Sequence, residues 1–135
     1  MNRIADYFLI TAAVFLVLGV ALGIWMGMSQ QFGQAHVHAH INLIGWASMA
    51  LFGLVYKAYP QLAAKRLAKA HFALSLVGAL IFLPGLPLAV AGVTPVAAIV
   101  GSNLWLLGAV SFLVVVCTGL LGAPARAKAA APAAA

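Results

Sequence analysis

The stretch YFLITAAVFLVLGVALGIWMGM, from Tyr7 to Met28, contains no charged residue. It is long enough to cross a bilayer as a helix, which takes about 20 apolar residues. Three further stretches are similarly long and apolar, at about His40 to Tyr59, His71 to Val93 and Val96 to Leu121. The sequence therefore predicts an all-α polytopic membrane protein with four transmembrane helices.

The composition supports this class. Of the 135 residues, 66% are hydrophobic and only 6% are charged, which is more apolar surface than a soluble domain of this size can bury. Residues 1–122 are expected to form the four-helix transmembrane domain, in contact with the lipid bilayer. Residues 123–135, which are rich in Ala and Pro, are expected to form a flexible cytoplasmic tail.

All basic residues fall on one side of this four-span arrangement. They precede the first span, flank the second connection or follow the fourth span: Arg3, Lys57, Lys65, Arg66, Lys69, Arg126 and Lys128. The positive-inside rule then predicts that both termini are cytoplasmic, in a bacterial inner membrane. The net charge of +6 is explained by topology, so no nucleic-acid partner is expected.

Few residues could carry out acid–base or nucleophilic chemistry. Asp6 is the only acidic residue, which excludes catalysis by paired carboxylates. Cys117 is the only cysteine, so an intrachain disulfide is excluded as well.

Three of the four histidines lie within five residues, at His36, His38 and His40, where the second span begins on the periplasmic side. Histidine is the commonest metal ligand, and an ionisable residue at the membrane edge usually serves a function. If a helix begins before His36, then His36 and His40 share a face and His38 points away. If this segment is a loop, all three can converge on one ion. The thioethers of Met26 and Met28 end the preceding span on the same side, and thioether with imidazole suits copper(I).

His71 opens the third span at the opposite end. It is expected about 25–30 Å from His40, too far to share one ion or cofactor within a protomer. We expect a helix-end histidine there, although Cys117 lies at a similar depth.

Small and polar residues recur in the outer half of the spans. Gly19, Gly23 and Gly27 form a stripe that favours close helix packing. Gly45, about one turn below His40, is the best place for a flat cofactor to approach, if the glycines serve more than helix packing.

Two asparagines also lie in the outer half, at Asn42 and Asn103. They could form interhelical hydrogen bonds or orient a ligand histidine. The prolines Pro84 and Pro87 are expected to kink the third span.

The run HINLIGWASMALFGLVYKAYP, from His40 to Pro60, resembles the second helix of subunit I in the haem–copper oxidase superfamily, most of all the nitric oxide reductase branch. The remainder of the chain is similar only loosely. The resemblance implies that His40, followed by Ile41-Asn42-Leu43, is an axial ligand of a low-spin haem b, with His38 as the alternative register.

The chain differs from that family in its ligands. It is far shorter than a full subunit I and lacks the further haem and copper ligands, so it is not expected to be an enzyme that reduces oxygen or nitric oxide by itself. It also has no outer arginine to hold haem propionates. A homo-oligomer could supply the missing ligand, either as a dimer with two copies of His40 or as a trimer, by analogy with the family's pseudo-threefold arrangement.

Three functions follow. The first is a b-type haem protein for electron transfer or O2/NO binding, with a respiratory redox partner, using His40 and assisted by His36 or His38. The second is a copper-binding membrane protein that uses the three histidines with Met26 and Met28. The third is a cofactor-free assembly or structural subunit.

Overall fold

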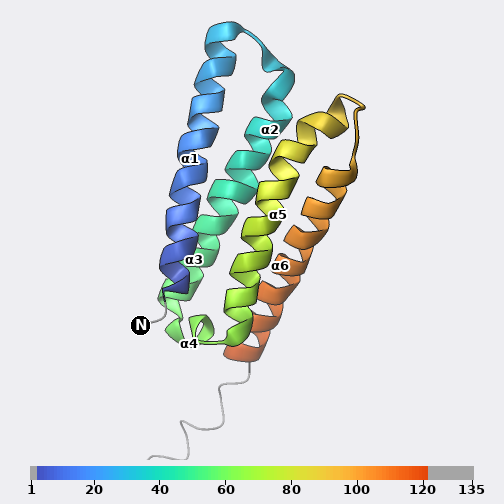
Figure 1. Cartoon of the computed structure of the whole chain (residues 1–135). Helices are drawn as coiled ribbons and strands as arrows, with labels where there is room; N and C mark the ends of the chain where they lie inside the picture. Colours follow the sequence, from blue (N-terminus) through green and yellow to red (C-terminus); the bar gives the residue numbers. More distant parts are fainter. Residues whose placement is uncertain (1–2, 122–135) are drawn as a thin grey trace, which may run out of the picture.

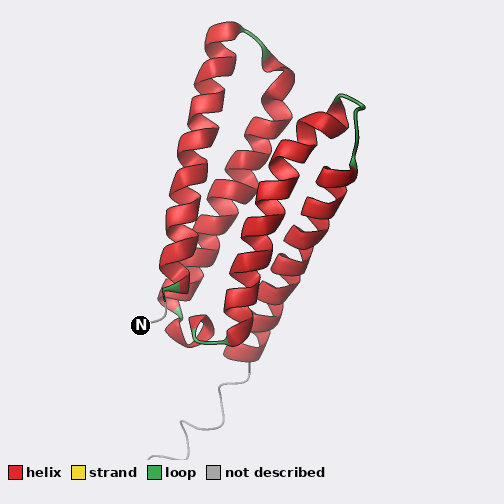
Figure 2. Ribbon diagram, viewed as in Figure 1, coloured by secondary structure: helices red, strands yellow, loops and turns green. Residues whose placement is uncertain are grey.

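Four long helices run up and down in the computed structural model, which describes residues 3–121 (Figure 1). They are joined by short connections, and the described residues contain no strand (Figure 2). The long helices are α1 (Ile4–Ser29), the continuous run Phe32–Ala58, α5 (Arg66–Val90) and α6 (Val96–Leu120). The second run is divided into η1 (Phe32–Gln34), α2 (Ala35–His40), η2 (Ile41–Ser48) and α3 (Met49–Ala58), and the short α4 (Pro60–Ala63) follows it.

Each of the four is long and apolar enough to cross a membrane, which confirms the predicted class. Two bounds differ most from the prediction. The second helical run begins at Phe32 rather than His40, and α5 begins at Arg66 rather than His71. At α5 the good helix formers Arg66, Leu67 and Ala68 extend the helix beyond its most apolar part. The helix α5 continues through Pro84 and Pro87 to Val90. The predicted tail, residues 123–135, lies outside the described residues.

The helices pair as two hairpins. α1 lies along η2 and α3, while α5 and α6 make the most extensive contact in the molecule. Glycines bring the backbones of α5 and α6 together: a Cβ on Gly78 would lie 2.7 Å from the backbone N of Trp105, and a Cβ on Gly101 would overlap the backbone of Phe82. This close approach without side chains is typical of small-residue contacts in membranes.

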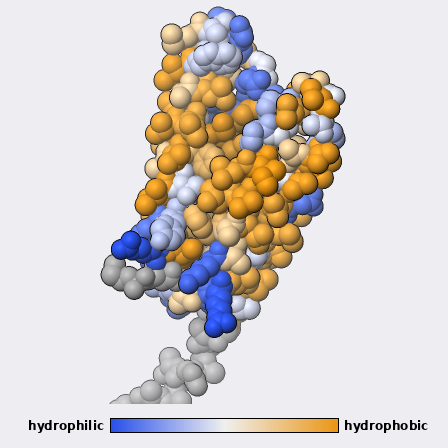
Figure 3. Space-filling view, viewed as in Figure 1, coloured by the Kyte–Doolittle hydropathy of each residue, from blue (hydrophilic) through white to orange (hydrophobic). Residues whose placement is uncertain are grey.

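Hydrophilic residues are visible at both ends of the molecule, and the most hydrophilic lie at the end where the chain begins (Figure 3). Lys57 of α3 and Asp6 of α1 form an ion pair, with Nζ and Oδ1 2.6 Å apart. Lys65 donates a hydrogen bond to the Thr118 hydroxyl of α6 at 2.7 Å. The rest of the visible face is mostly apolar, as expected for a surface in contact with lipid.

Candidate functional site on α2

The three clustered histidines lie on a helix. The helix α2 begins at Ala35, before the first of them, so His36 and His40 stand one turn apart on one face and His38 faces elsewhere. This is the first of the two arrangements that the sequence allowed. The three side chains are all partly buried, yet they have different surroundings.

His38 is directed toward α1. Its Nδ1 donates a hydrogen bond to the carbonyl oxygen of Gly19 at 2.9 Å. The ring lies over Gly23, where a Cβ would come within 2.9 Å of its Cε1 atom. Asn42 donates to the carbonyl oxygen of His38 at 2.8 Å and lies over Gly19. Part of the predicted glycine stripe on α1 therefore accommodates two polar side chains of the neighbouring helix.

His40 makes a different contact. Its Nδ1 donates to the carbonyl oxygen of His36 at 2.7 Å, one turn earlier in the same helix. A carbonyl oxygen can only accept, so Nδ1 carries the hydrogen and Nε2 of the neutral ring keeps a lone pair. Its ring packs against the ring of Phe82 on α5 in a T-shaped arrangement, with centroids 5.3 Å apart and an angle of 69° between the ring planes. The orientation of His40 is thus fixed by contacts that leave Nε2 available as a ligand atom.

The Nε2 atom of His36 is buried and has no hydrogen-bond partner among residues 3–121. A buried polar atom without a partner is uncommon and points to a ligand, an ion or water in the working protein. Because His36 and His40 share a face, two imidazole nitrogens are on the same side of α2.

Immediately after His40 the helix widens. Residues Ile41–Ser48 form a π-helix, and the Ser48 hydroxyl donates to the carbonyl oxygen of Leu43, five residues earlier, at 2.8 Å. π-helical segments are rare and often lie at functional sites. Nothing in the sequence predicted this segment, because its apolar pattern is equally consistent with an α-helix.

The other residues considered from the sequence lie elsewhere or are already in contact. Met28 is 83% exposed, whereas Met26 is buried. The position above Gly45 is filled by Phe15, since a Cβ there would lie 2.6 Å from the ring, so helix packing accounts for this glycine. Asn103 is exposed on α6 and donates to the carbonyl oxygen of Ile99 in its own helix at 2.8 Å. It therefore neither bridges helices nor orients a histidine.

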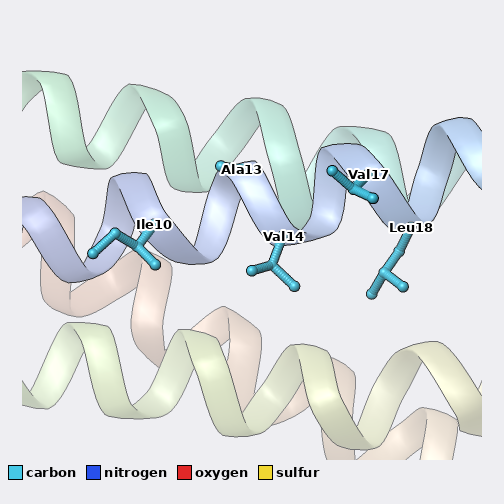
Figure 4. Close-up of a pocket in the computed structure, with 5 residues that line it drawn as sticks. All are labelled: Ile10, Ala13, Val14, Val17 and Leu18. Carbon is cyan, nitrogen blue, oxygen red and sulfur yellow. The ribbon is translucent and has the colours of Figure 1, made fainter.

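An apolar groove lies between α1 and α5 next to the cluster. It has a volume of about 230 Å³ and is lined by Phe15, Leu18, Ile41, Ala79, Leu80, Leu83 and Pro84. A separate apolar hollow lies along α1 over Ile10, Ala13, Val14, Val17 and Leu18 (Figure 4). Pro84 has no N–H to donate to the carbonyl oxygen of Leu80, so α5 lacks one backbone hydrogen bond where it forms the wall of the groove.

Within residues 3–121, no three His, Cys, Asp or Glu side chains are grouped so as to hold a metal ion. The chain thus offers the His36 and His40 nitrogens on one face of α2. It does not by itself complete a coordination sphere of the kind that structural metal sites have.

The fourth histidine was misplaced by sequence reasoning. His71 is fully buried rather than at a helix end, five residues into α5, and its Nδ1 is hydrogen bonded to the Tyr56 hydroxyl at 2.9 Å. Cys117, by contrast, is exposed. One signal in the sequence could have located His71. His71 and Ser75 form a polar face on one helix, and the preceding span carries the aromatic residues Phe52 and Tyr56, also one turn apart, which can cover such a face.

Comparisons of this chain with protein-family models, curated proteins and solved structures found no match.

Proposed function

We propose that this chain is a membrane-embedded b-type haem protein in which His40 is an axial ligand, and that it functions as a homo-oligomer. The observation that carries the proposal is the hydrogen bond from His40 Nδ1 to the carbonyl oxygen of His36. It holds the ring in the tautomer that metal-binding histidines use, with Nε2 as the donor atom. The likeness of His40 to Pro60 to the second helix of haem–copper oxidase subunit I points to the same residue.

The surroundings of His40 could supply a haem with one axial ligand and with an apolar surface on one side only. The adjoining groove, about 230 Å³, is smaller than the ~300–1,000 Å³ of common ligand sites, and its lining is apolar. A haem next to His40 would therefore need a second copy of the chain for its other face. A dimer would bring a second His40 to it, and a trimer is the alternative arrangement.

The bound haem would transfer electrons or bind a small gas such as O2 or NO. His36 is the assisting residue, because its Nε2 is unpartnered and on the face of His40. His38 acts through helix positioning, since it is hydrogen bonded to α1. By the positive-inside rule, the site would face the periplasm from a bacterial inner membrane, close to a redox partner.

A bare transition metal is the second candidate. The specific observation in its favour is the buried, unpartnered Nε2 of His36, one turn from His40. Imidazole nitrogen suits copper and other first-row metals. This site would also require ligands from another copy, because within residues 3–121 no third His, Cys, Asp or Glu side chain is grouped with these two.

A reduced-minus-oxidised absorption spectrum of the purified protein tests the first candidate, with elemental analysis for the second. We expect haem bands that disappear in His40→Ala and remain in Asn103→Ala, a matched control whose side chain bonds only its own helix. Stoichiometric copper without porphyrin would select the second candidate. A colourless, metal-free protein that co-purifies with an oxidase would instead support an assembly role.

A further inference from the structure

A second polar cluster is buried near the opposite end of the molecule. His71 and Ser75 stand one turn apart on α5, and both are 0% exposed. They are the buried polar side chains of the described core. Their helix face meets α1, α3 and α6, so the cluster lies where the two hairpins come together.

Aromatic rings enclose the imidazole of His71. The ring centroids of Phe8, Phe52 and Phe112 lie 4.8, 4.6 and 5.1 Å from its own. None of these side chains can accept or donate a conventional hydrogen bond. The enclosure therefore excludes bulk solvent from His71, and among the described residues its ring nitrogens have a polar contact only with Tyr56.

The contact with Tyr56 determines where the imidazole hydrogen lies. The Tyr56 side chain is 1% exposed, and its hydroxyl has His71 Nδ1 as a neighbour at 2.9 Å. A buried phenol needs an acceptor for its hydrogen, and Nδ1 serves if it keeps its lone pair. Nε2 of the neutral ring then carries the hydrogen and becomes a donor.

Two polar atoms of the cluster remain without partners. Within residues 3–121, neither His71 Nε2 nor Ser75 Oγ has a hydrogen bond. They belong to side chains four residues apart on one helix face, and they are not bonded to each other. A ligand that accepts from the N–H and also bonds the hydroxyl would satisfy both atoms, and a water molecule is the smallest that does so.

We propose that His71 Nε2 and Ser75 Oγ bind one buried water molecule, which extends the hydrogen-bonded pair of Tyr56 on α3 and His71 on α5 as far as Ser75. A metal ion would need a lone pair on Nε2, which this tautomer does not provide. The site is independent of the proposed haem, because it uses no residue of the outer cluster.

The site can be tested by NMR on full-length protein with 15N-labelled histidine in nanodiscs. His71 is assigned by the signals that vanish in His71→Gln. We expect Nδ1 without a hydrogen, Nε2 with one, and a cross-relaxation signal between that N–H and a water proton. In Ser75→Ala the water signal should be lost. The control Ser111→Ala should keep it, because the Ser111 hydroxyl bonds the carbonyl oxygen of Leu107 in its own helix, α6.

The wild-type spectrum alone can decide against the site. An Nε2 without a hydrogen would overturn the proposal, as would an Nε2–H that shows no contact with water. Retention of the water signal in Ser75→Ala would also overturn it, because the hydroxyl would then not be a ligand. These outcomes do not depend on whether the protein contains haem, so they are separate from the fate of the proposed function.

Discussion

Nδ1 of His38 donates to the carbonyl oxygen of Gly19 across the interface of α1 and α2, at 2.9 Å. The histidine in the middle of the cluster therefore joins two helices, while its neighbours His36 and His40 face the other way. This separates the three residues by role: one is held by a neighbouring helix, and two present nitrogens on a shared face.

His38→Ala is expected to destabilise the protein without removing the haem that we propose. The substitution deletes one interhelical hydrogen bond, worth about 0.6–1.5 kcal/mol, and leaves Gly23 uncovered. Thermal unfolding in detergent measures the stability, and the absorption spectrum measures the haem content per folded protein. Loss of haem in folded His38→Ala with haem retained in His40→Ala would assign the ligand to His38 instead.

Gly23→Ala should weaken the same interface, and Gly27→Ala should not. The added Cβ at position 23 would lie 2.9 Å from Cε1 of His38, whose ring is already held by its hydrogen bond to Gly19. At Gly27, by contrast, no described residue lies within 4 Å of an added Cβ. Overpacking costs about 1–3 kcal/mol, while Ala for Gly in an open helix position gains up to about 1 kcal/mol. The two midpoints of thermal unfolding should move in opposite directions, and equal shifts would contradict the contact.

The α5–α6 hairpin should be more sensitive still. In Gly101→Ala the new methyl group would overlap the backbone of Phe82, which cannot turn away as a side chain can. We expect a loss of about 1–3 kcal/mol or more in stability. Ser102→Ala is the control, because that hydroxyl is exposed and bonds the carbonyl oxygen of Ile99 in its own helix. A Gly101→Ala protein as stable as this control would show that the two helices are farther apart.

The four spans could be predicted from the sequence because long apolar runs have few alternatives to a membrane helix. Which helices pair most closely could not. The conspicuous glycine stripe is on α1, but the closest backbone approach is between α5 and α6, at Gly78 and Gly101. The positions of the glycines show where another helix can approach closely, whereas which helix does so depends on the shapes of both helix surfaces.

The cluster and the buried histidine show the same limit. Spacing along a helix predicted that His36 and His40 share a face, since this follows from the helical period alone. The π-helix from Ile41 to Ser48 and the burial of His71 did not follow from it, because they depend on tertiary contacts. For His71, the hydropathy of the span suggested a helix end, whereas aromatic rings from three other helices cover the residue.

Orientation in the membrane is open to a direct test with single cysteines in a Cys117→Ser background. The two positions lie at opposite ends of the bundle: Ser29 is the last residue of α1, and Ala64 lies in the second connection, between α4 and α5. The variants are Ser29→Cys and Ala64→Cys. Since Lys57, Lys65 and Arg66 gather at the Ala64 end, we expect a membrane-impermeant maleimide to label Ser29→Cys in intact cells. Ala64→Cys should be labelled only after permeabilisation. The reverse pattern would place the histidine cluster in the cytoplasm, where a periplasmic redox partner could not reach it.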